Sequence, residues 1–361
     1  MKIKKSKLKS ALATVGAAQG KATLKILECV HIAPSDKGGV DVTASNLDLT
    51  VTAWIPPDDC EGCIETPLCV DHRRLSQIVG AMDGAEVVVT SDGKNAVVTD
   101  GRAMYRLPVS DAADFPARKE IATEAFTLPL KEFTASLGAV SHAANSDGTR
   151  RVLQAVFFER CPEGVFIVAA DGRRLARRRI EGKGDGGGVV IPLKSVASIA
   201  SLGAGASSEE QLTVKFDAMS AQFSARGVTV TTSLVAEVYP LYRQVIPTAS
   251  TDDTVELDRA EILAALRRAS ICTGLTRSTR FKFAKNELLI TGQSEGEGAY
   301  REAIPIKWEA PPAECSLDCK FFADAISNAD GETVEFLWRG KFNAIEIRAG
   351  AHQEIVMPLT A

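Results

Sequence analysis

Short runs in which apolar and polar residues alternate dominate the chain, and this alternation is typical of strands that turn one face toward a core. The clearest runs are residues 40–43, 86–90, 97–99, 165–168, 229–232 and 288–291. Asp-Gly dipeptides supply turn chemistry, because glycine adopts a positive φ without strain. They begin at Asp83, Asp92, Asp100, Asp147, Asp171, Asp185 and Asp330. The pattern predicts antiparallel hairpins and meanders.

Six other segments carry apolar residues at intervals of three and four, as in Phe133, Leu137 and Val140. This spacing predicts short amphipathic helices that each bury one face. The segments are residues 6–19, 72–82, 130–143, 194–202, 259–270 and 319–328. Each is followed by several predicted strands.

The order of helices and strands repeats along the chain. Strand ends at Ala44, Ala170 and Gly292 lie about 120 to 126 residues apart, and the second helix of each unit recurs at a similar interval. A fixed period of this kind indicates tandem domains. We therefore predict an α+β fold of three tandem domains, 1–122, 123–248 and 249–361, with a linker at 249–253. Each domain holds two repeats of a short helix packed on antiparallel strands.

The formal net charge of −4 for 361 residues does not by itself favour nucleic acid as a partner. The charges are unevenly distributed, however. Two predicted helices contain Lys7, Lys9 and Lys194 but no acid, whereas acids gather in loops such as Asp58-Asp59. Helices on one side of the sheets would form a basic surface for DNA phosphates. The alternative is that these are ordinary solvated helix faces.

Eight cysteines are too few for a disulfide-stapled secreted protein, so we expect reduced thiols. Cys60 and Cys63 have C-x-x-C spacing near Cys69, but no second pair completes a zinc site. We interpret Cys60 and Cys63 as structural or incidental thiols, and we interpret Cys315 and Cys319 in the same way. The sequence shows no stretch of about 18 uncharged apolar residues and no nucleotide or cofactor motif. We expect a cytoplasmic protein without a metal or cofactor.

One motif suggests an enzyme. Residues 292–296 fit G-x-S-x-G around Ser294, and Asp318 and His352 follow downstream as possible triad partners. A nucleophile elbow opens a helix, whereas residues 299–304 are predicted to form a strand. A serine hydrolase is therefore the weakest alternative, and no residue is assigned a catalytic role.

Seven segments, in order and over nearly the full length, resemble the bacterial DNA sliding clamp, the beta subunit of DNA polymerase III. They are residues 43–49, 114–116, 150–159, 168–176, 191–194, 239–247 and 355–359. The resemblance implies half of a ring, with a head-to-tail homodimer closing around duplex DNA. It implies a processivity factor rather than an enzyme, which tethers replicative polymerase, clamp loader and repair clients through short linear peptides.

The resemblance also implies three groups of site residues. Contacts to DNA, independent of its sequence, would come from Lys21, Arg73, Arg102, Arg150, Arg151 and Lys194. The dimer interface would join Arg74, Ile78, Tyr105 and Leu107 of one protomer to Ile271 and Cys272 of the other. The client-peptide cleft would consist of Leu153, Ala170, Gly172, Arg173, Arg174, Leu175, Pro240, Gln244, Val245, Val356, Met357, Pro358 and Leu359.

Three positions depart from the family pattern: Arg151-Val152 at the DNA-facing side, Cys272 at the interface and Thr360-Ala361 at the end of the chain. A different class of function also stays open. A protein with the clamp fold could act as an adaptor that binds client peptides without encircling DNA.

Overall fold

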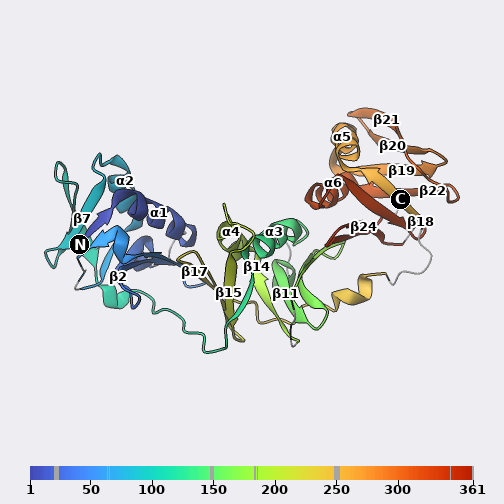
Figure 1. The fold of residues 1–361 in the computed structure, drawn as a ribbon. Helices are drawn as coiled ribbons and strands as arrows, with labels where there is room; N and C mark the ends of the chain where they lie inside the picture. Colours follow the sequence, from blue (N-terminus) through green and yellow to red (C-terminus); the bar gives the residue numbers. More distant parts are fainter. Residues whose placement is uncertain are drawn as a thin grey trace. The chain divides into compact units, whose positions relative to one another are not determined.

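The computed structural model describes residues 1–19, 24–62, 64, 66–146, 150–182, 184, 186–247, 253–341 and 343–359 (Figure 1). The chain divides into two compact units. Unit 1 comprises Met1–Thr134 with Ala197–Leu234, and unit 2 comprises Ala135–Val196 with Val235–Ala361. Lys21, Cys63, Thr360 and Ala361, as well as most of the predicted linker, lie outside the described residues.

All six predicted helices are confirmed, with small differences at their ends. They are α1 (Lys5–Val15), α2 (His72–Ala81), α3 (Leu130–Ser141), α4 (Leu193–Ser201), α5 (Arg259–Ala269) and α6 (Cys319–Asn328). The largest difference is at the end of the first helix, which was predicted to reach residue 19. It ends at Val15, because a 3-10 turn at Gly16–Ala18 follows. No helix in the described part of the chain is long and apolar enough to span a membrane.

Three helices begin directly after an aspartate that caps them. The carboxylate of Asp71 accepts a hydrogen bond from a backbone N–H in the first turn of α2, and Asp258 and Asp318 do the same for α5 and α6. Such caps satisfy N–H groups that have no partner inside the helix. The helix starts are therefore encoded locally.

Unit 1 contains a 13-stranded sheet within the described residues. Its order is β10-β15-β16-β17-β4-β3-β2-β6-β9-β8-β7-β1-β5. The strands are β1 (Lys2–Lys4), β2 (Cys29–Pro34), β3 (Val40–Ser45), β4 (Leu49–Ile55), β5 (Cys60–Glu61), β6 (Leu68–Asp71), β7 (Glu86–Ser91), β8 (Asn95–Thr99), β9 (Met104–Ser110), β10 (Phe126–Pro129), β15 (Gln211–Phe216), β16 (Ser220–Ala225) and β17 (Val228–Ser233).

The helices α1 and α2 of unit 1 pack against each other, and α1 also lies on β3 and β4. Leu8 and Leu12 of α1 and Leu75 of α2 are almost fully buried. The segment after β9 also contacts this sheet, because Phe115 stacks on His31 with ring centroids 5.0 Å apart. Arg118, further along, donates to Asp41 at 2.8 Å. Helix α1 and the connecting segment therefore both pack on this sheet.

Unit 2 contains an eight-stranded and a four-stranded sheet within the described chain, ordered β14-β11-β12-β13-β25-β24-β23-β18 and β21-β20-β19-β22. The strands are β11 (Ala155–Cys161), β12 (Gly164–Ala170), β13 (Arg174–Ile180), β14 (Gly188–Pro192), β18 (Asp253–Asp258), β19 (Ser278–Ala284), β20 (Glu287–Ser294), β21 (Gly298–Pro305), β22 (Ala313–Asp318), β23 (Thr333–Trp338), β24 (Ile345–Ala349) and β25 (His352–Val356).

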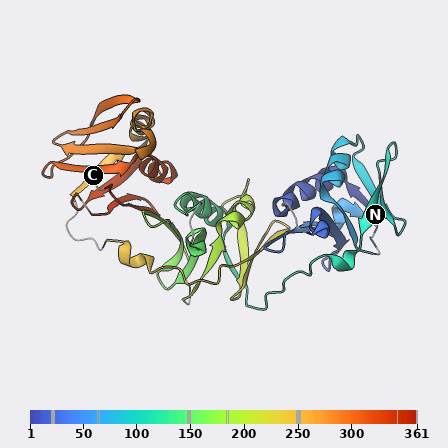
Figure 2. The ribbon, with the colours of Figure 1, turned by 180° about the vertical axis from the view of Figure 1, so that it is seen from behind.

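Two of the apolar clusters in the described part of unit 2 lie near the site. The larger lies under α5 and α6, which pack side by side (orange and red in Figure 2), and includes the aromatic residues Phe281, Phe283 and Phe322. In the smaller cluster, Tyr239 and Tyr242 pack against side chains of the strands β11 to β13. This second core forms the floor of the site described below.

The predicted α+β class is confirmed, and so are the predicted strands at 40–43, 86–90, 97–99, 165–168, 229–232 and 288–291. The segment 123–248 contributes β10 and β15 to β17 to unit 1 and β11 to β14 to unit 2. Its strands β17 and β13 pair with β4 and β25, respectively. The division into three tandem domains stays a prediction.

Candidate functional site

The turn between β12 and β13 forms one wall of a pocket in unit 2. Asp171 accepts hydrogen bonds from the backbone N–H groups of Arg173 and Arg174 at 2.8 and 3.0 Å. Gly172 adopts a φ of +90°, which glycine allows without strain. The N–H of Met357, just beyond β25, donates to the carbonyl of Arg173 at 2.9 Å. The turn therefore fixes the end of β25 beside it.

The segment 239–245 forms the opposite wall. The ring of Tyr239 stacks on Phe157 with centroids 4.8 Å apart and planes 7° apart. The hydroxyl of Tyr242 donates to Glu159, which also accepts from Arg243 at 2.9 Å. Burial and the Glu159 carboxylate raise the pKa of Tyr242 above its usual range, so its hydroxyl stays protonated. Stacking and hydrogen bonding hold this segment on the sheet.

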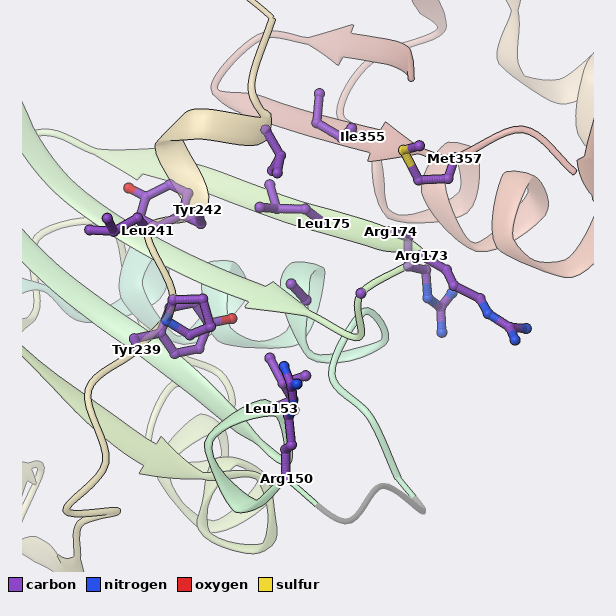
Figure 3. Close-up of a pocket in the computed structure, with 14 residues that line it drawn as sticks. Arg150, Leu153, Arg173, Arg174, Leu175, Tyr239, Leu241, Tyr242, Ile355 and Met357 are labelled. Carbon is purple, nitrogen blue, oxygen red and sulfur yellow. The ribbon is translucent and has the colours of Figure 1, made fainter. Parts of the chain in front are cut away.

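Between these walls lies a pocket of about 230 Å³ with mainly apolar walls (Figure 3). Its lining residues come from β12, β13, β25, the segment 239–245 and the turn before β11. They are Arg150, Leu153, Ala170, Gly172, Arg173, Arg174, Leu175, Tyr239, Pro240, Leu241, Tyr242, Val245, Ile355 and Met357.

The structure brings most of the predicted cleft residues together in this pocket. Those that line it are Leu153, Ala170, Gly172, Arg173, Arg174, Leu175, Pro240, Val245 and Met357. Those that do not line it are Gln244, Val356, Pro358 and Leu359. The residues that sequence reasoning missed are Tyr239, Leu241, Tyr242 and Ile355. Arg150, which was predicted to contact DNA, also lines the pocket.

Val356 fails to line the pocket because successive side chains of a strand point to opposite faces. Ile355 and Met357 line the pocket, whereas Val356 between them is fully buried in the core that contains Phe336. Leu359, beyond the strand, donates its backbone N–H to the carbonyl of Ser316 at 2.8 Å. This alternation is a signal that would have identified Ile355 from the sequence.

Arg174 is a structural member of the pocket wall. It is only 8% exposed. Its guanidinium donates to Asp171 at 3.0 Å, to Asp324 at 2.9 Å and to the carbonyl of His142, and it lies 4.1 Å from the ring centroid of Phe321. Its charge is therefore compensated inside the protein.

Two buried carboxylates lie on the strands beside the pocket. Burial alone would raise the pKa of Glu346, but hydrogen bonds from Arg348, Gln353 and Arg339 outweigh it and lower that pKa. Glu354 on β25 is fully buried, and one of its oxygens lies 2.9 Å from a ring nitrogen of His352. These polar contacts fix β24 and β25, the latter of which carries Ile355.

The predicted DNA contacts are surface residues where the structure describes them. Arg73 on α2, Arg102 in the turn between β8 and β9, Arg151 in a 3-10 turn and Lys194 at the start of α4 are all exposed. Lys7 of α1 is also exposed and pairs with Asp59 at 3.0 Å. Exposed cations of this kind can meet phosphates without reading base edges.

The predicted interface residues differ in exposure. Arg74 and Tyr105 are exposed and Ile271 is 72% exposed, whereas Leu107 is only 6% exposed and packs inside unit 1. Ile78 and Cys272 are half-buried. Two exposed apolar side chains near these positions were missed, because exposure does not follow from residue type. They are Met104 at 64% and Leu275 at 101%.

The described cysteines are free thiols, most of them buried. Within the described chain, no group of three or more His, Cys, Asp or Glu residues could hold a metal ion. Cys60 is half-buried, and Cys63, the other cysteine of the C-x-x-C spacing, lies outside the described residues. Burial raises the pKa of Cys69 and of Cys315 to about 12, so both stay protonated at neutral pH.

The Ser294 motif does not form a nucleophile elbow. Ser294 ends β20, and a tight turn leads directly into β21, with the N–H of Glu297 donating to the Ser294 carbonyl at 3.2 Å. Asp318 caps α6, and His352 pairs with Glu354. The strand-to-helix turn that a hydrolase needs is therefore replaced by a hairpin.

Known proteins with the same fold were found by sequence and by structure. Residues 127–241 match the model of the DNA polymerase III beta subunit central domain, and residues 243–359 match that of its C-terminal domain, together almost two thirds of the chain. The beta sliding clamp of Salmonella typhimurium is 25% identical over 348 residues, 94% of this chain and 93% of the relative.

Two solved structures extend the likeness to the whole chain. The sliding clamp from Pseudomonas aeruginosa bound to griselimycin has a TM-score of 0.93 at 19% identity, covering 100% of this chain and 99% of the other. The sliding clamp from Bacillus subtilis has a TM-score of 0.91 at 23% identity, covering 100% and 98%. The chain belongs to the family of DNA polymerase III beta subunits, the bacterial sliding clamps.

Proposed function

We propose that this sliding clamp closes as a head-to-tail homodimer around duplex DNA and tethers polymerase and other clients through the pocket of unit 2. It acts by topology and peptide binding and performs no covalent chemistry. The observation that carries the proposal is the clamp fold over the whole chain, at TM-scores of 0.91 and 0.93.

Two strand edges support closure of a ring. Residues 104–108 of β9 pair with β8 on one side, and in the described chain their other side has no strand partner. β21 is the outermost strand of its four-stranded sheet. Exposed strand edges favour pairing with another chain. A head-to-tail dimer joins the edge of β9 to that of β21 on the partner, which covers both.

Exposed apolar side chains lie near these two edges. Met104 and Tyr105 belong to β9, whereas Ile271 and Leu275 follow α5 in unit 2. Because burial of apolar surface drives association, contact between the two groups would stabilise the dimer. Arg74 and Cys272 flank the apolar contact.

The exposed cations support binding to DNA of any sequence. Arg73, Arg102, Arg151 and Lys194 are long flexible side chains that suit phosphate contacts, and Lys21 and Arg150 are proposed to share this role. Contacts to phosphate hold DNA without fixing its sequence, which a mobile tether requires.

The decisive experiment compares retention on circular and linear DNA as salt rises. After loading by a clamp loader, a closed ring stays on nicked circular DNA at about 0.5 M salt but slides off linear DNA with free ends. An ordinary basic DNA-binding protein dissociates from both, because its affinity falls steeply with salt. Equal loss from both DNAs would contradict the ring.

The same comparison separates the ring from a peptide-binding adaptor with the clamp fold. An adaptor would bind client peptides yet show no retention on circular DNA. Light scattering at micromolar concentration adds an independent criterion, because the ring requires a dimer. A monomer that still binds peptides would favour the adaptor.

A further inference from the structure

The hydroxyl of Tyr239 is buried in the pocket without a partner. The residue is 6% exposed, and its oxygen makes no hydrogen bond to any residue that the structure describes. Figure 3 shows this hydroxyl directed toward the other lining residues, whereas the hydroxyl of Tyr242 points away from them toward Glu159. Two tyrosines of the same segment therefore differ in the role of their hydroxyl groups.

An unpaired buried hydroxyl is unfavourable for folding, because it loses its bonds to water without replacement. Burial raises the pKa of Tyr239 above its usual range, and the neighbouring Tyr242 acts in the same direction. The hydroxyl is therefore protonated at neutral pH. Its proton is available to an acceptor that enters the pocket.

The ionisable groups at the pocket mouth have one sign. Apart from its tyrosines, its titratable lining residues are Arg150, Arg173 and Arg174, and no Asp or Glu among the described residues lines it. The charge of Arg174 is compensated by Asp171 and Asp324. Arg150 and Arg173 are exposed, and in the described chain neither side chain pairs with an acid. They favour an acidic ligand over a basic one.

We propose that the pocket selects apolar peptides flanked by acidic residues, with the Tyr239 hydroxyl donating a hydrogen bond to a peptide oxygen and Arg150 and Arg173 pairing with the acidic flanks. This inference rests on the proposed function, because it names the chemistry of the clients. Tyr239 is a specificity-determining residue that aligns the peptide in the apolar pocket.

The test uses three pools of N-acetylated heptapeptides and the full-length protein. The five central positions of each pool mix Leu, Phe, Met and Val, and both ends carry Asp, Asn or Lys. Competition against a fluorescent Asp-pool peptide measures affinity. We expect the native chain to bind the Asp pool with the highest affinity, the Asn pool with lower affinity and the Lys pool with the lowest. The affinities for the Asp and Asn pools should become equal in high salt or in the Arg150→Gln/Arg173→Gln variant.

Tyr239→Phe removes only the hydroxyl and keeps the ring on Phe157. We expect affinity for the Asp and Asn pools to fall about threefold to tenfold, the effect of one net hydrogen bond. The matched control is Tyr300→Phe on β21, whose lost hydroxyl donates to Glu302; its peptide affinity stays at the native value.

Stability separates this role from a structural one. Tyr239→Phe keeps or raises the midpoint of urea unfolding, since the lost hydroxyl has no partner in the described chain. Tyr242→Phe lowers that midpoint, because Glu159 loses a donor. A lower midpoint with unchanged affinity in Tyr239→Phe would overturn the proposal.

The remaining outcomes are also distinct. Equal binding of the Lys and Asp pools would overturn the acidic preference. The native chain could also bind no pool and still be retained on circular DNA. That result would contradict the proposed tethering of peptides through this pocket, and not only the preference for acidic flanks.

Discussion

Arg174 on β13 donates a hydrogen bond to Asp324 on α6 at 2.9 Å, so a side chain of the pocket wall is bound to a helix 150 residues away in sequence. Burial alone would raise the pKa of Asp324, but hydrogen bonds from Arg174 and Lys320 outweigh it and lower that pKa. The carboxylate is therefore ionised at neutral pH. The contact fixes the pocket wall on the larger core of unit 2.

Replacing Arg174 with alanine removes a donor from Asp171, from the carbonyl of His142 and from Asp324, which keeps its hydrogen bond from Lys320. We expect the free energy of unfolding of unit 2 to fall by about 3 kcal/mol, the usual effect of breaking one partner of a buried pair. Urea unfolding followed by circular dichroism measures the change. The matched control is Arg173→Ala at the exposed neighbouring position, and equal losses in both variants would contradict the structural role of Arg174.

Acid should weaken unit 2 through Glu346 and Asp324. Both have a pKa below the usual value in the folded state, so the unfolded chain binds protons more readily. Their stabilisation is complete above the unfolded pKa of about 4 and is lost as pH falls through the lower folded pKa. Urea midpoints from pH 7 to pH 3 record the loss. Glu346→Gln should be less stable than the native chain at pH 7, and its stability should depend less on pH. If the urea midpoint of this variant fell with pH as steeply as that of the native chain, Glu346 would not contribute to the acid sensitivity.

Neighbouring residues at the end of β25 should respond differently to truncation. Met357→Ala removes an apolar side chain that is 44% exposed in the pocket, so client-peptide affinity should fall about tenfold with little change in stability. Val356→Ala removes buried methyl groups from the core, so the free energy of unfolding should fall by about 1 to 2 kcal/mol. Fluorescence anisotropy and urea unfolding measure the two effects. If the folded Val356→Ala variant bound peptide more weakly and Met357→Ala did not, the assignment of Met357 to the pocket and Val356 to the core would be wrong.

A charge at the proposed dimer contact should dissociate the ring. Ile271→Asp combined with Leu275→Asp would bury carboxylates against the apolar side chains of β9 on the partner, which is strongly unfavourable. We expect the dimer dissociation constant to rise at least a hundredfold, measured by sedimentation. Met219→Asp is the control, because this side chain is 76% exposed in the turn before β16. Dissociation in both variants would indicate a general effect of charge.

Local structure could be predicted from the sequence with good accuracy. The six helices follow from apolar spacing such as Phe133, Leu137 and Val140, and aspartates such as Asp71 mark where three of them start. Strands follow from alternation, which depends only on neighbours along the chain. Both signals are short-range, which is why the helix boundaries differ from the predicted ones by no more than four residues.

The site could be predicted only in part. Leu153, Leu175 and Met357 were found through the resemblance, and they do line one pocket. Ile355 was missed although strand alternation pointed to it, whereas Tyr239 was missed because whether such a side chain faces a core or a pocket depends on its partners across the fold. Val356 illustrates the same limit, since its neighbours in sequence line the pocket and it does not.

The sequence by itself determined the helices, the strands, the α+β class and the resemblance to a clamp family, because these depend on local periodicity and on the order of motifs. Only the tertiary structure decided that segments near residues 172, 240 and 356 meet around one pocket. It also decided that Arg174 is held inside the protein and that the hydroxyl of Tyr239 faces the pocket without a partner in the described chain. The physical reason is that burial and pairing arise between residues distant in sequence, and no local pattern records them.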